Sequence, residues 1–136
     1  MQKYIKFLIL SIILSSNAQA VTCYITMVKA SCWKDYNLTV NVLNASTGVK
    51  QGTIMVFSGD LWGRDKFECK PGQTLSLEAQ FTPVFWEKDD GRIYKARRFW
   101  KLPDKVTDDI TGWNVTVCYP KWFSDVPYPP EASGDC

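Results

Sequence analysis

YNLTVNVLN, residues 36–44, shows the strict alternation of apolar and polar side chains that is typical of a half-buried β-strand. Leu38, Val40 and Val42 fall on one face, and the Asn and Thr residues between them fall on the other. One face of this segment is therefore suited to a core and the other to water, as in an antiparallel sheet that is packed on one side.

The same period of two recurs along most of the chain, whereas no window shows a convincing helical stripe. The other predicted strands are CYITMVK (23–29), TIMVF (53–57), KFECK (66–70), TLSLEAQF (74–81), IYKARRFWKL (93–102) and WNVTVCY (113–119). Turn and loop signals separate them, including NASTGVKQG (44–52), SGDLWGRD (58–65), Pro71-Gly72 and EKDDGR (87–92). The pattern predicts an all-β fold, an antiparallel, disulfide-stabilised β-sandwich of about seven strands of Greek-key or immunoglobulin-like kind; a small β-barrel is the alternative.

The first twenty residues, MQKYIKFLILSIILSSNAQA, have the layout of a bacterial secretory signal. Lys3 and Lys6 precede an apolar run at 7–14, and Ala18 and Ala20 provide the small residues that a signal peptidase reads. We expect cleavage after Ala20, a single domain at 21–136 and a periplasmic or secreted protein. The alternative is lipid attachment at Cys23, but Thr22 directly before it fits a lipoprotein signal poorly.

Charge and composition exclude several classes of function. The chain has 16 Lys and Arg against 14 Asp and Glu, and removal of Lys3 and Lys6 with the signal leaves 14 of each. Zero net charge gives no electrostatic case for nucleic acid or for an anionic membrane, and no later segment is long and apolar enough to insert. The chain has no His, which excludes Ser-His-Asp catalysis and His-ligated zinc. It also has no C-x-x-C pair or phosphate-binding loop, so we expect no metal and no cofactor.

Paired carboxylates could still hydrolyse glycosides without His. The two candidate pairs, Asp89-Asp90 and Asp108-Asp109, are adjacent in sequence and lie in turn-like segments. Adjacent side chains of an extended backbone point to opposite sides, which does not form a catalytic pair. We therefore expect a protein that is not an enzyme, with a small His-free hydrolase as an alternative.

The five Cys residues follow an export signal, so disulfides are expected. In WNVTVCY, Cys118 lies on the polar face with Asn114 and Thr116, so its partner must reach it from outside the sheet. The Pro-containing tail at 120–136 ends in Cys136, and we predict a Cys118–Cys136 bridge that folds the tail over this face. Cys69 shares the inward face with Phe67, and we predict a Cys32–Cys69 bridge. Cys23 is then left free, either as an inert thiol in the first strand or as the site of a disulfide-linked dimer.

Two local signals indicate binding. Lys95, Arg97 and Lys101 share one strand face with Phe99, an arrangement that could hold an anion beside an aromatic ring. Other aromatic candidates lie in a Gly-flanked loop and in the tail: Trp62, Trp122, Phe123 and Tyr128. The alternatives are a solvated outer face for the cations and a structural role for the rings, which would close the ends of a small core.

Together these patterns predict an exported, non-catalytic binding or accessory module. Its partner would be a protein or a glycan of the cell envelope or outside the cell. A second hypothesis is a structural or assembly component that forms stable contacts with itself or a neighbour through an edge strand or through Cys23.

Overall fold

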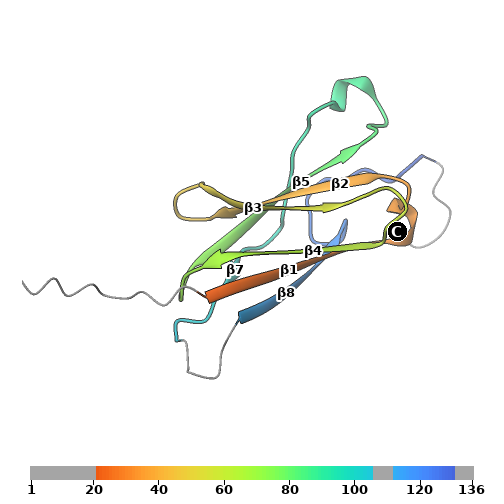
Figure 1. The fold of residues 1–136 in the computed structure, drawn as a ribbon. Helices are drawn as coiled ribbons and strands as arrows, with labels where there is room; N and C mark the ends of the chain where they lie inside the picture. Colours follow the sequence, from red (N-terminus) through yellow and green to blue (C-terminus); the bar gives the residue numbers. More distant parts are fainter. Residues whose placement is uncertain (1–20, 106–111, 131–136) are drawn as a thin grey trace, which may run out of the picture.

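Two β-sheets pack face to face in the computed structural model, which describes residues 21–105 and 112–130 (Figure 1). The predicted signal at 1–20, the Asp108-Asp109 pair and Cys136 lie outside the described residues. The strands are β1 (Val21–Lys29), β2 (Asn37–Asn44), β3 (Lys50–Val56), β4 (Trp62–Cys69), β5 (Thr74–Thr82), β6 (Tyr94–Lys95), β7 (Trp100–Lys101) and β8 (Gly112–Tyr119), with short 3-10 turns η1 (Ser31–Trp33) and η2 (Glu87–Asp89).

The small sheet has the order β4-β1-β8, and the large sheet has the order β3-β2-β5-β6, with β7 also paired to β5. This arrangement confirms the predicted β-sandwich. All the pairs are antiparallel except one, because β1 runs parallel to β8, with Thr22 beside Gly112 and Lys29 beside Tyr119. The first and last strands of the domain are therefore neighbours, which alternation along the chain could not reveal.

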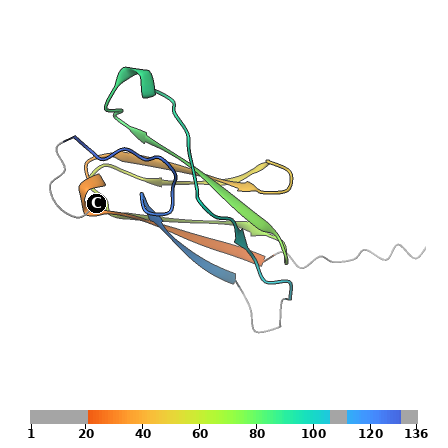
Figure 2. The ribbon, with the colours of Figure 1, turned by 180° about the vertical axis from the view of Figure 1, so that it is seen from behind.

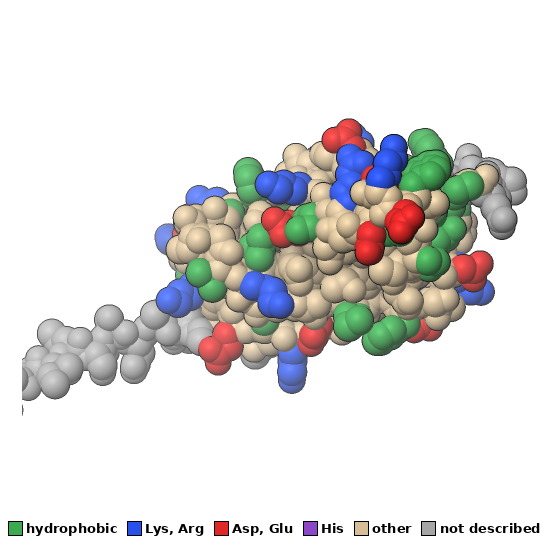
Figure 3. Space-filling model, turned by 90° about the horizontal axis from the view of Figure 1, so that it is seen from above, with side chains coloured by type: hydrophobic (Ala, Val, Ile, Leu, Met, Phe, Trp, Pro, Cys, Tyr) green, Lys and Arg blue, Asp and Glu red, His purple; other side chains and the backbone are tan. Residues whose placement is uncertain are grey.

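The apolar side chains of the alternating strands fill the space between the sheets, as predicted. Leu38, Val40 and Val42 of β2 are buried, and every second residue of β1 and β5 is buried as well. Apart from Leu43, the opposite positions of β2 and β5 carry Asn, Thr, Ser, Glu and Gln. Figure 3 views the molecule from the top of Figure 1 and shows acidic and basic side chains interspersed with scattered apolar ones on this side. The outer face of the large sheet is thus the solvent-exposed polar face that the sequence predicted.

The predicted strand across residues 93–102 is wrong as a continuous strand. Only β6 and β7 pair with β5, and each has 2 residues. Between them the backbone turns to the tail: Ala96 pairs with Phe123, and the Arg97 N–H donates to the Trp122 carbonyl at 2.8 Å. Two consecutive Arg residues interrupt the alternation here. The segment therefore divides its hydrogen bonds between β5 and the tail.

Residues 58–65, which were predicted as a loop, divide between a short corner and the start of β4 at Trp62. This corner carries the chain from the large sheet to the small one. A Cβ atom at Gly63 would lie 2.6 Å from the carbonyl oxygen of Met55, so only glycine allows β3 and β4 to approach this closely. This close approach sets the position of Trp62, the first residue of β4.

A buried lysine holds the same corner in place. Lys29 ends β1, and its Nζ donates to the carbonyl oxygens of Tyr36 and Phe57, at 3.0 Å for Phe57. The Lys29 N–H also donates to the Leu61 carbonyl at 2.7 Å, one residue before Trp62. Burial lowers the pKa of Lys29, and Asp60 and Asp35 oppose this shift. Lys29 therefore ties the end of β1 to the loop that leads into β4.

The disulfide predictions are wrong. Cys69 points inward as expected, but it is bonded to Cys23 on the neighbouring strand, where Val21 lies directly opposite Cys69. Cys32 is also disulfide-bonded and is not the partner of Cys69. Cys118 lies on the outer face as predicted but is a free thiol. Strand parity identified the faces of Cys69 and Cys118 correctly but could not show which strands are neighbours.

Candidate recognition surface

The outer face of the small sheet carries the most distinctive group of polar and aromatic side chains. Alternate residues of three strands point away from the core on this side: Thr22, Tyr24, Thr26 and Val28 of β1, Trp62, Arg64, Lys66 and Glu68 of β4, and Asn114, Thr116 and Cys118 of β8. Strand pairing arranges them in rows. Tyr24 lies between Lys66 and Asn114, and Val28 lies between Trp62 and Cys118.

Arg64 connects all three strands. Its guanidinium carbon lies 4.6 Å from the centroid of the Tyr24 ring on β1, within the range of a cation–π contact. Its Nη2 donates to Oδ1 of Asn114 on β8 at 2.8 Å. Arg64 therefore reaches across β1, with its guanidinium over the Tyr24 ring and its Nη2 bonded to Asn114.

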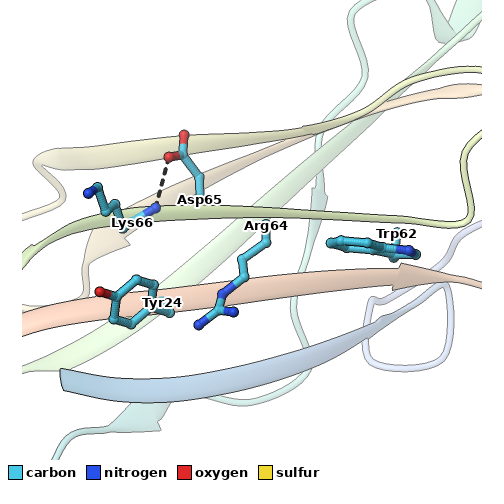
Figure 4. A pocket seen from close by; sticks show the side chains of 5 residues that line it. All are labelled: Tyr24, Trp62, Arg64, Asp65 and Lys66. Atoms are coloured by element: carbon cyan, nitrogen blue, oxygen red, sulfur yellow. Dashed lines mark hydrogen bonds between the residues drawn. The ribbon is translucent and has the colours of Figure 1, made fainter.

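Gly112 makes room for the Tyr24 ring. A Cβ atom at position 112 would lie 2.9 Å from Cε2 of Tyr24, closer than side-chain atoms normally approach. Tyr24, Arg64 and Trp62 then follow one another along the face, as Figure 4 shows. We call these three residues, together with Asn114, the Tyr24–Trp62 surface.

Two open hollows meet at Trp62. The first, about 620 Å³, is lined by Tyr24, Trp62, Arg64, Asp65 and Lys66. The second, about 530 Å³, is lined by Lys34, Gly59, Asp60, Leu61 and Trp62. The Trp62 side chain is 63% exposed and so offers most of its ring to a ligand. An exposed aromatic ring beside an anchored Arg combines two of the residue types that dominate binding energy at recognition surfaces.

The predicted binding residues do not form one site. Trp62 belongs to the Tyr24–Trp62 surface, whereas Arg97, Phe123 and Tyr128 lie around a separate hollow of about 290 Å³ beside the tail. Phe123 is 1% exposed, so its assignment as an exposed binding residue is wrong; it is part of the core. Trp122 is partly buried and lies under Arg98, whose guanidinium carbon is 5.4 Å from a Trp122 ring centroid.

The predicted cationic row is divided among separate partners. Lys95 lies opposite Glu78 on β5, and Nζ of Lys101 lies 3.8 Å from the Asp104 carboxylate. Nε of Arg97 donates to the Phe123 carbonyl at 3.0 Å. Phe99 is exposed beside them. An anion-binding role for these residues stays a prediction.

Tyr24 and Arg64 were missed from the sequence. Trp62, Arg64, Lys66 and Glu68 occupy alternate positions, which is a strand signal, but Asp65 stands among the inward positions and obscured it. An inward charge on an edge strand protects the edge from unwanted pairing. The inward charge of Asp65 could therefore have identified residues 62–69 as an edge strand, with Trp62 and Arg64 on the same face.

Comparison with protein-family models, with curated protein sequences and with solved structures finds no significant match to this chain. Among residues 21–105 and 112–130, no helix is long and apolar enough to cross a membrane. The Cys23–Cys69 disulfide is a bond typical of proteins in an oxidising compartment.

Proposed function

We propose that this protein is an exported binding module that recognises a saccharide on the Tyr24–Trp62 surface. The observation that supports this most directly is Arg64, which is held between the Tyr24 ring and the Asn114 amide beside the exposed ring of Trp62. Because these contacts are already made, Arg64 loses little conformational freedom when a ligand binds. The role is proposed to be binding and not catalysis.

The chemistry of this surface suits a sugar. The exposed ring of Trp62 can cover the apolar face of a pyranose ring, while the Tyr24 ring holds Arg64 in place. The hydroxyls of Thr26 and Thr116 lie in the row beside Arg64. Arg64 and Lys66 add positive charge at the same hollow, which favours a sugar that carries a carboxylate. A glycan of the cell envelope or outside the cell is therefore the proposed ligand class, and a protein partner is the alternative.

Export is supported by two features. The first twenty residues have the layout of a cleavable signal, and Cys23 is bonded to Cys69. Because Sγ of Cys23 is used in this disulfide, it has no valence left for a thioether-linked lipid. A mature chain that begins at Val21 would also keep the whole of β1.

The test is glycan binding by oxidised mature protein, measured by array screening and then by calorimetry with the best neutral and acidic oligosaccharides. We expect Trp62→Ala to weaken binding by about tenfold or more, because a central aromatic anchor is worth roughly 2 kcal/mol. Trp86→Ala is the matched control, since Trp86 is also about half exposed but lies before η2. Its affinity should equal that of the wild type.

If Trp62→Ala binds the same glycan as tightly as the wild type, the Tyr24–Trp62 surface is not the site. If no oligosaccharide binds, while affinity capture returns a protein whose binding depends on Trp62, the surface recognises protein and the saccharide assignment is wrong.

A further inference from the structure

The two edges of the small sheet differ in how they are protected. β4 carries Arg64, Asp65, Lys66 and Glu68 within its 8 residues, and Asp65 is an exposed charge at an inward position. Charges of this kind on an edge strand prevent other strands from pairing with it. β4 is therefore a protected edge.

β8 has none of this protection. Its 8 residues, GWNVTVCY, include no charged residue and no proline. Among the described residues it pairs with β1 alone, and it bounds the small sheet in both Figure 1 and Figure 2. The Cys118 carbonyl accepts from the Trp122 N–H at 3.1 Å, which closes one end of the free edge. Residues 113–117 make no backbone hydrogen bond to any described residue outside β1. Natural proteins rarely leave so long an uncharged edge uncovered.

We propose that β8 pairs with β8 of a second copy of this chain, antiparallel and about a two-fold axis. A two-fold pairing centred on Thr116 sets Val115 opposite Val117 on the inner face and Asn114 opposite Cys118 on the outer face. The inner pair is apolar and the outer pair is uncharged, so the strand is compatible with itself. The Cys118 carbonyl keeps its bond to the Trp122 N–H, so the pairing rests on the residues between 114 and 118. A second copy would thus provide hydrogen-bond partners for the backbone N–H and C=O groups on the open edge of β8, without placing like charges opposite one another.

This dimer does not use Cys23, whose thiol is bonded within the chain, and it borders the proposed saccharide site, because Asn114 and Thr116 of β8 lie on that same outer face. The two-fold axis runs perpendicular to the joined sheet, so both copies present the Tyr24–Trp62 surface on the same side. The order of strands across the joined sheet would be β4-β1-β8 followed by the same strands in reverse.

The first measurement is the mass of oxidised mature protein by sedimentation over a range of concentrations. Wild type should be a dimer, and Thr116→Lys should be a monomer, because the axis brings the two introduced charges together. Thr82→Lys, an exposed change on the outer face of β5, is the matched control and should remain a dimer. A wild type that is monomeric at every concentration, or a Thr116→Lys variant that stays dimeric, overturns the proposal.

A second variant keeps the test decisive if Thr116→Lys fails to fold. In Asn114→Cys the introduced thiol lies opposite Cys118 of the second copy. Mild oxidation should therefore give a disulfide-linked dimer that a reductant separates into monomers. Thr82→Cys is the control and should stay monomeric on a non-reducing gel. Absence of the covalent dimer in Asn114→Cys overturns the proposal.

Discussion

The guanidinium of Arg64 lies over the ring of Tyr24, with 4.6 Å between its central carbon and the ring centroid, although the two residues come from different strands of the small sheet. Because the contact is on the surface, we expect it to contribute to local order more than to global stability. We expect the interaction energy of this pair to increase when a bound ligand excludes water from the site.

A double-mutant cycle should measure this contact. Arg64→Ala and Tyr24→Ala together should show a coupling energy of about 0.5–1 kcal/mol in urea unfolding, the usual range for an exposed cation–π pair. Arg64→Ala combined with Tyr128→Ala is the control and should be additive, since Tyr128 lies beside the tail hollow. Zero coupling in the first cycle would show that the pair does not persist in solution.

The Cys23–Cys69 disulfide should be a major source of stability. The two residues are separated by 46 positions, and closing a loop of that length in the unfolded chain is worth about 4 kcal/mol in the chain-entropy model. Replacing both residues by Ala should lower the free energy of unfolding by about that amount. Cys118→Ser, which changes the free thiol, should alter it by less than about 0.5 kcal/mol. Equal effects of the two changes would contradict the assigned bridge.

The exported chain should begin at Val21 and carry no lipid. The intact mass of protein collected from the periplasm or medium checks this directly, and reduction should add the mass of two hydrogens for each disulfide. A diacylglycerol adduct on an N-terminal Cys23 would contradict both the cleavage site and the Cys23–Cys69 bond.

Tyr119 should make the fold sensitive to alkali. Burial raises the pKa of Tyr119, with a smaller contribution from Tyr94, and its hydroxyl has no hydrogen-bond partner among the described residues. The neutral ring is favoured in the folded state, so its contribution is fully present below the unfolded pKa of about 10 and is lost as the pH rises further. Tyr119→Phe should reduce this alkaline loss in pH-dependent unfolding. Tyr128→Phe, at an exposed ring, should behave as the wild type; if the two variants match, Tyr119 is not the source.

The tail should stabilise the domain through Phe123. This ring is buried and lies 5.5 Å from the Tyr119 ring, between centroids. Phe123→Ala should cost about 3–5 kcal/mol, the usual range for removing a buried aromatic side chain. Tyr128→Ala, in the same segment but exposed, should cost under about 1 kcal/mol. A small effect of Phe123→Ala would show that the tail is dispensable for folding.

Local patterns predicted the elements well because burial between two sheets imposes a period of two on the sequence. Leu38, Val40 and Val42 could be assigned to the core from their spacing alone. Phe123 could not, because the tail has no alternation and enters the core by pairing with Ala96. Aromatic residues in an irregular segment look the same in the sequence whether they are covered or exposed.

Relations between strands were beyond the reach of the sequence. Parity placed Cys69 on the inward face but could not show that β1 is beside β4, so the wrong partner was chosen. The same limit hid the recognition surface. Tyr24 and Arg64 are far apart in sequence, and only the register of β1 against β4 brings them together.

The parallel pairing of β1 with β8 also sets the order in which the sheet can be completed. β1 is made first and lies at the centre of the small sheet, yet one of its two neighbours is the last strand to be made. Pairings between distant parts of a chain form slowly, because the intervening chain must first be ordered. A nascent or truncated chain that lacks residues 112–119 therefore exposes an unpaired edge on β1. Such a chain would aggregate through this edge until β8 arrives to cover it.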